Sequence, residues 1–185
     1  MDDRYQRGVT LIEVLLALAL LVVLITQAVP AFGQWLERHR LQSAARAVAA
    51  DLQLAHREAI AQSSSRPVYL HFRTGSSWCY GITRRSDCDC RRRNPAHPEA
   101  CLFTRRNVQR LVRRDAGPYQ GIALTRARFA RSASVRFDPL RGLARAGRIE
   151  LENRHGEQLQ IRVSPLGRIR TCRPGGRGSM GIETC

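Results

Sequence analysis

Two patterns of apolar residues divide the chain. Residues 9–29 are almost continuously apolar and read VTLIEVLLALALLVVLITQAV. Further along, apolar residues recur at steps of three and four, the spacing of one helical face: Leu41, Ala45, Val48, Leu52, Ala55 and Ala59. Polar residues fall on the opposite faces: Arg38, Arg40, Arg46, Asp51 and Arg57. We therefore predict one helix over about residues 9–62, on the order of 80 Å long, ending at Ser63-Ser64-Ser65.

After Pro67 the apolar period changes from helical to alternating. Val68, Leu70 and Phe72 alternate with other residues, which is typical of a strand. We predict further strands at 78–83, 122–129, 134–137, 148–151, 159–163 and 168–172, with turns at 75–77, 153–156 and 164–167. Residues 84–114 are polar and rich in arginine, and we interpret them as a long loop. The predicted fold class is α+β, a long N-terminal helix packed on an antiparallel β domain.

The apolar run is long enough to span a bilayer as a helix. Arg4 and Arg7 precede it and would hold that end on the cytoplasmic side. A secretory signal peptide needs a small-residue cleavage site after the run, and residues 30–33 are a poor match to one. Glu13 lies inside the run, where a charge costs roughly 2.5 kcal/mol or more and usually has a partner and a function. Pro30 is expected to kink or locally melt the helix.

Charge narrows the possible partners. The chain has 31 Lys+Arg, all of them arginine, against 15 acidic residues, which gives a net charge of +16. A strongly basic surface attracts polyanions such as nucleic acid, anionic lipid or acidic cell-surface polymers. The alternative is a generally cationic, solvated surface.

The cysteines indicate an oxidising compartment, because six in so short a chain is typical of secreted domains. All follow the apolar run: Cys79, Cys88, Cys90, Cys101, Cys172 and Cys185. Cys88, Cys90 and Cys101 with His97 could suggest zinc, but disulfides suit an oxidising compartment better. Since neighbours at i and i+2 rarely pair, Cys88 and Cys90 are expected to reach Cys79 and Cys101 in some order. Cys172 and Cys185 would close a C-terminal loop, a stabilisation of roughly 3 kcal/mol.

Residues 7–13, RGVTLIE, resemble the type III signal of type IV pilins and type II secretion pseudopilins. The resemblance implies that a membrane peptidase cuts after Gly8 and methylates Val9, so that Glu13 becomes the fifth residue of the mature chain. Glu13 would then neutralise the α-amino group of Val9 in the apolar filament core, where neither charge is tolerable alone. Position 9 departs from the usual phenylalanine. The alternative is a simple membrane anchor.

Other motifs resemble the GspH/FimT family of minor pilins and pseudopilins: residues 52–60, 78–81, 88–90 and 167–170. That resemblance implies a pilin fold. Gly167, Arg168, Ile169 and Arg170 match the G-R-x-R motif by which members of the FimT branch bind DNA during natural transformation.

The residues support this reading independently. In a strand, Arg168 and Arg170 would project to one face about 6.5–7 Å apart, close to the phosphate spacing of one DNA strand. Arg173 and Arg177 would add charge inside the closed loop. Contacts of this kind predict salt-sensitive binding without sequence specificity. The alternative is an edge strand with solvated arginines. A second basic concentration, which could extend the DNA site or keep a loop soluble, comprises Arg91, Arg92, Arg93, Arg105, Arg106, Arg110, Arg113 and Arg114.

No catalytic motif is present, so we expect no enzyme and no cofactor; the five histidines are expected to be surface or hydrogen-bonded residues. The predicted organisation is a leader at 1–8, a transmembrane and assembly segment at 9–33, an amphipathic helix half at 34–63 and a globular β domain at 64–185. The predicted function is a minor pilin that binds extracellular DNA for uptake. The alternative is a structural subunit that primes pilus or type II secretion pseudopilus assembly. The expected partners are DNA, other pilins, prepilin peptidase and the inner membrane, with the C-terminal domain in the periplasm and later at the cell surface.

Overall fold

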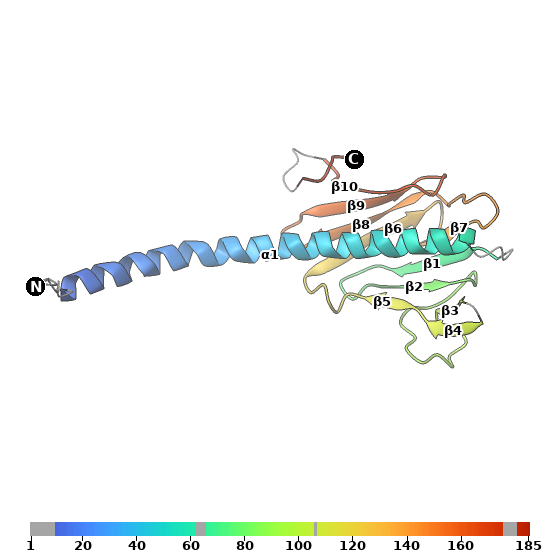
Figure 1. Ribbon diagram of the computed structural model, residues 1–185, viewed down its shortest axis with the longest axis horizontal. Coiled ribbons are helices and arrows are strands. Elements are labelled where there is room, and N and C mark those ends of the chain that lie inside the picture. The colour runs from blue at the N-terminus through green and yellow to red at the C-terminus, as the bar shows by residue number, and fades with distance from the viewer. Residues whose placement is uncertain (1–9, 62–65, 106, 176–180) are drawn as a thin grey trace, which may run out of the picture. The chain divides into compact units, whose positions relative to one another are not determined.

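The computed structural model describes residues 10–61, 66–105, 107–175 and 181–185 (Figure 1). The chain divides into two compact units, Met1–Leu36 and Glu37–Cys185. One long helix, α1 (Leu11–Ala61), begins in the first unit and ends in the second. Its bounds confirm the predicted helix to within two residues at each end.

In the first unit, α1 is helical from Leu11 onward and its large apolar side chains are exposed. Thr10 caps the helix, since the backbone N–H of Glu13 lies 3.4 Å from its Oγ1. The backbone stays helical at Pro30, so the predicted local melting is not seen. By length and composition this helix could cross a membrane.

In the second unit, one face of α1 enters the protein core. The residues of the predicted apolar stripe are all buried, together with Ala44: Leu41, Ala45, Val48, Leu52, Ala55 and Ala59. Asp51, outside the apolar stripe as predicted, is half-buried. Its carboxylate accepts a hydrogen bond from the Tyr80 hydroxyl at 2.8 Å and pairs with Arg114 at 3.2 Å.

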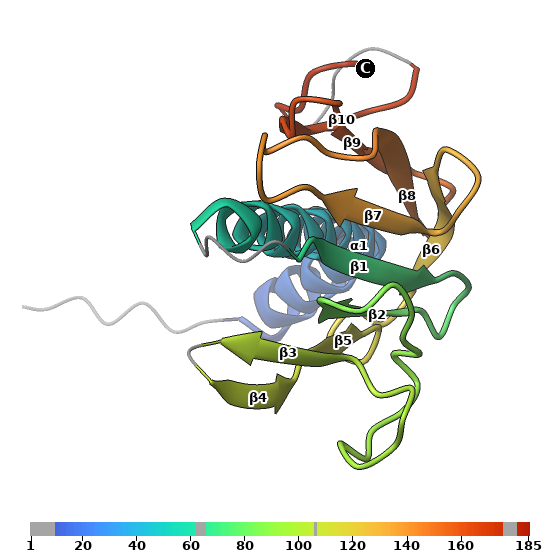
Figure 2. The same cartoon turned by 90° about the vertical axis from the view of Figure 1, so that its right-hand side faces the viewer.

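Two antiparallel sheets complete the core around this half of the helix (Figure 2). The first sheet has the order β5-β2-β1-β7, formed by β1 (Val68–Arg73), β2 (Cys79–Thr83), β5 (Arg113–Asp115) and β7 (Ser134–Phe137). The second sheet has the order β10-β9-β8-β6, formed by β6 (Ile122–Phe129), β8 (Gly147–Asn153), β9 (Gln158–Val163) and β10 (Ile169–Cys172). The predicted α+β fold is confirmed.

The predicted loop over residues 84–114 is partly wrong. It contains β5 and a separate hairpin of β3 (Leu102–Arg105) and β4 (Val108–Leu111). Only Phe103 of this hairpin is buried, so the strands carry little of the apolar alternation that identifies a strand in sequence. Asn107 provides the turn with a positive φ of 65°. Residues 84–101 do form a loop, which the disulfide Cys79–Cys90 attaches to β2 and which Cys88–Cys101 closes at the residue before β3.

Candidate functional site

The turn that leads into β10 is shaped by Gly167. Its backbone N–H donates to the Ser164 carbonyl at 3.0 Å, which closes the predicted tight turn. Gly167 is buried and has a φ of 76°, a conformation that side chains disfavour. A Cβ at this position would also collide with the ring of His56 on α1. Gly167 therefore fixes the turn and its approach to the helix.

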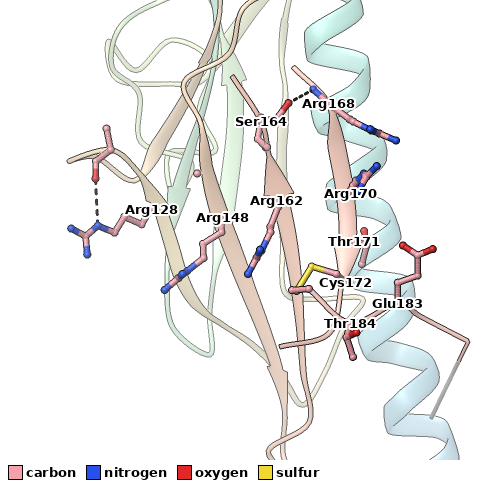
Figure 3. A pocket seen from close by; sticks show the side chains of 14 residues that line it. Arg128, Arg148, Arg162, Ser164, Arg168, Arg170, Thr171, Cys172, Glu183 and Thr184 are labelled. Carbon is pink, nitrogen blue, oxygen red and sulfur yellow. Dashed lines mark hydrogen bonds between the residues drawn. A yellow bond between two sulfur atoms is a disulfide. The ribbon is translucent and has the colours of Figure 1, made fainter. Parts of the chain in front are cut away.

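Arg168 and Arg170 follow this turn at the free edge of the second sheet (Figure 3). Arg168 lies one residue before β10, so the predicted strand starts one residue late, and its backbone N–H donates to Ser164 Oγ at 3.1 Å. Both arginine side chains are exposed. Within the described part of the chain, neither guanidinium forms an ion pair. Two uncompensated cations therefore stand next to each other at this edge.

The C-terminal segment folds back beside β10. The disulfide Cys172–Cys185 closes it, as expected from the spacing. Arg173 N donates to the Glu183 carbonyl at 2.9 Å, and Cys185 N donates to the Arg173 carbonyl at 2.9 Å. Arg173 is half-buried in this contact. Arg177 lies outside the described residues.

Sequence reasoning missed three further arginines that the strand register brings into line with Arg170. Arg128 is opposite Arg148, Arg148 is opposite Arg162, and Arg162 is opposite Arg170. We call these four residues the arginine row. The signal was hidden because it depends on the register of four strands from distant parts of the sequence, and each strand contributes only one arginine.

The arginine row lines a groove of about 1110 Å³ on the outer face of the second sheet. Five arginines line it, because Arg168 joins the row, and among the described lining residues one side-chain carboxylate, that of Glu183, accompanies them. The residues 183–185 form part of its lining on the β10 side. Figure 3 shows Arg128, Arg148 and Arg162 side by side on neighbouring strands, with Arg170 on the edge strand. Such a surface suits an extended anion.

Most of the row is not neutralised by protein carboxylates. Arg128 Nε donates to the Ala130 carbonyl at 3.4 Å, and Arg162 Nε donates to Gln160 Oε1 at 3.2 Å, both neutral acceptors. Arg148 alone in the row pairs with a described carboxylate, Glu150 at 2.8 Å. The positive charge of the groove is therefore available to a ligand.

The second basic concentration is built differently. Six of its arginines each lie within 4.0 Å of a carboxylate, and we call them the paired arginines: Arg91, Arg92, Arg93, Arg105, Arg113 and Arg114. Arg110 has an exposed side chain, and Arg106 lies outside the described residues.

The pKa is lowered for two of these carboxyl groups, those of Asp89 and Asp115. Hydrogen bonds from Arg91 hold the pKa of Asp89 below its usual range, with the charge of Arg73 adding to the effect. For Asp115, the backbone N–H of Gly117 is the main cause of a lowered pKa, followed by Arg113. Both groups remain ionised and keep their arginines occupied.

The remaining predicted residues have structural or undescribed positions. Gly8 and Val9 lie outside the described residues, and Glu13 is exposed in the first turn of α1. Cys88, Cys90 and Cys101 are all in disulfides, so they offer no thiolate to zinc. The histidines are surface or bonded residues, as expected: His56 Nε2 lies 2.8 Å from the Gly142 carbonyl, for example.

Comparison with known proteins gives two matches. Residues 44–167, more than half of the chain, match the family described as Type II transport protein GspH. Residues 3–26 match the prokaryotic N-terminal methylation motif. Searches of curated proteins and of solved structures return no significant match. Members of this family are structural, non-enzymatic subunits of pilin type. With its long helix, antiparallel sheets and prepilin signal, the chain belongs to the GspH family as a minor pilin or pseudopilin of the GspH/FimT type.

Proposed function

We propose that this minor pilin binds extracellular DNA without sequence specificity, for uptake in natural transformation. The observation that carries the proposal is the pair Arg168 and Arg170, exposed and without an ion pair among the described residues, at the edge of an arginine-lined groove. The family match ends at residue 167, so DNA binding does not follow from family membership. It rests on the motif and on the charge around it.

The proposal includes a route to the cell surface. Prepilin peptidase removes residues 1–8 and methylates Val9, and the helix holds the chain in the inner membrane with its C-terminal domain in the periplasm until it joins other pilins in the filament. The methylation-motif match and the apolar helix support membrane anchoring and assembly. The mass of the mature protein tests the cleavage site, because a chain that keeps residues 1–8 in cells with prepilin peptidase contradicts it.

A soluble fragment beginning at Gln34 tests DNA binding, since the buried core starts at Leu41 and all three disulfides follow it. We expect this fragment to retard duplex DNA in a gel-shift assay, with affinity that falls as salt rises. Arg168→Gln with Arg170→Gln should weaken binding markedly. Unchanged retardation would move the site to residues 91–114.

The second candidate is a structural role in priming pilus or type II secretion pseudopilus assembly, which the description of the matched family favours. Deletion of the gene separates the two. Loss of surface pili and twitching indicates priming, whereas normal piliation with lost transformability indicates DNA capture. Point variants at Arg168 and Arg170 give the cleaner comparison, because they leave the assembly helix intact.

A further inference from the structure

The arginine row is unusual for a sheet because it places like charges directly opposite each other on three successive strand pairs. Like charges in such positions destabilise a sheet, whereas opposite charges stabilise it. The neighbouring register positions follow the ordinary rule. Arg126 is opposite Glu150, which is opposite Gln160, and the Arg126–Glu150 ion pair measures 3.4 Å. Repulsion along the row therefore lowers the stability of the second sheet. The neighbouring register positions of the same sheet have balanced charges.

We propose that the arginine row is a phosphate-binding track that carries one DNA strand across the second sheet, from β6 to the edge strand β10. This inference rests on the proposed function and deepens it. The site assigned from the motif ends at Arg168 and Arg170, while the track adds Arg128, Arg148 and Arg162 on the other three strands, β6, β8 and β9. Bound phosphates replace the missing carboxylates and relieve the repulsion along the row.

Spacing favours a regular polyanion over a small anion. Neighbouring strands lie about 4.8 Å apart, so Arg128 and Arg170 are separated by roughly 14 Å along the row. Consecutive phosphates of one DNA strand are about 6.5–7 Å apart, so such a stretch presents about three phosphates to the row. Arginine suits these contacts because its planar guanidinium binds phosphate oxygens in pairs.

The two ends of the groove differ in charge. Glu183 and the segment closed by Cys172–Cys185 lie on the β10 side, so a carboxylate stands next to the edge arginines. On the β6 side the groove is lined by Arg128 and Ala130, which carry no negative charge. The repulsive side chain described in the groove is therefore on the β10 side, next to the edge arginines.

The test uses the full chain in a nonionic detergent and a fluorescent 30-base-pair duplex, with affinity measured by anisotropy from 50 to 300 mM salt. The row variant is Arg128→Gln with Arg162→Gln, two residues whose hydrogen bonds within the described part of the chain go to neutral acceptors. The edge variant is Arg168→Gln with Arg170→Gln. The control variant, Arg38→Gln with Arg136→Gln, removes the same charge from arginines paired with Glu157 at 2.7 Å and Asp138 at 3.5 Å.

We expect the row variant to bind at least about tenfold more weakly in 0.1 M salt and to lower the salt slope by about 1.8, since each phosphate contact contributes about 0.9. The control variant should stay within about threefold of the wild type with an unchanged slope, because its guanidiniums contact no phosphate. Arg128→Lys with Arg162→Lys keeps the charge and should restore most of the slope, which separates loss of contacts from loss of fold.

Two results overturn the track. If the row variant binds like the control while the edge variant loses affinity, DNA stops at β10 and the proposed function stands without the track. An acidic face of another subunit would then be the better occupant of the row. If the wild-type chain itself does not bind the duplex, the proposed function fails and the track fails with it.

Discussion

The six paired arginines and the four residues of the arginine row have different surroundings, although Arg148 of the row also pairs with Glu150. Each paired arginine lies within 4.0 Å of a carboxylate from α1, the 84–101 loop or β5. In the row, Arg128 and Arg162 contact neutral acceptors and Arg170 has no ion pair within the described residues. Positive charge in the first region holds a loop-rich part of the fold together. In the second it is left for a ligand.

The difference shows that charge density along a sequence is a poor guide to a binding surface. Arg91, Arg92 and Arg93 form the densest basic run in the chain, yet all three are paired. The arginine row has one arginine per strand and becomes a cluster only through strand register. A cation must be both exposed and uncompensated before it offers energy to a polyanion.

The strongest test of the comparison removes two positive charges from the groove and, in a separate variant, two from the paired arginines. Arg168→Gln with Arg170→Gln should lower DNA affinity about 50-fold in 0.1 M salt, because each phosphate contact contributes roughly a factor of eight between 1 M and 0.1 M salt. Arg92→Gln with Arg93→Gln should lower it less than about threefold, since those cations are already occupied. Anisotropy titrations measure both. A larger loss in the second variant would reverse the comparison.

A second test keeps every charge and displaces the turn that precedes the edge strand β10. Gly167→Ala forces a side chain into a positive-φ turn and against His56, which should destabilise the protein by about 1–2 kcal/mol. Chemical denaturation measures this loss, and DNA affinity should fall with it because Arg168 is displaced. Gly156→Ala is the matched control, since Gly156 also has a positive φ of 75° but open space around its Cβ. Equal affinity in Gly167→Ala and the wild type would mean that charge alone matters.

A third test compares the effect of a substitution on the free energy of unfolding with its effect on DNA affinity. Arg162→Thr should raise the free energy of unfolding by about 0.5 kcal/mol, because it removes two like-charge pairs from the row, while it weakens DNA binding. Arg114→Gln should lower the free energy of unfolding by about 0.5 kcal/mol through loss of its contact with Asp51. Urea denaturation measures both. If Arg162→Thr destabilises the fold, the row is not under repulsion.

A smaller effect is expected from the one carboxylate in the groove. Glu183→Gln should raise DNA affinity by about two- to threefold, because one repulsive charge on the β10 side is removed. Glu99→Gln, in the paired region, serves as control, since that carboxylate lies 3.4 Å from Arg92 and away from the groove. An equal gain in both variants would indicate a general effect of net charge.

The smallest expected effect concerns pH and the paired region alone. The pKa of Asp89 is lowered in the folded state, so its stabilisation is complete above the usual carboxyl pKa of about 3.9 and is lost as pH falls through the lower folded value. Asp89→Asn should therefore cost more stability at pH 6 than at pH 3. Urea denaturation at the two pH values measures the difference, and an equal cost at both would show that Asp89 acts without its charge.

Local patterns gave much of the fold. The helix followed from the apolar run and the stripe from Leu41 to Ala59, and β6 and β7 from alternating apolar residues, with a bulge in β6 between Leu124 and Arg126. The β3–β4 hairpin was missed because only Phe103 is buried in it. The division of the strands into two sheets could not be predicted from the sequence either, because it depends on which strands pair. At the site, the prediction identified Arg168 and Arg170 through a motif, while Arg128, Arg148 and Arg162 required the register of β6, β8 and β9.

The contact between Gly167 and His56 has a mechanical consequence. The turn that carries Arg168 rests on an imidazole of α1, and His56 itself is held by the Gly142 carbonyl and packs against Phe137. A force on β10 would therefore reach α1 directly, through the contact between the Gly167 turn and the His56 ring. Under the proposed function, tension on bound DNA would reach α1 from this turn through one side chain, that of His56.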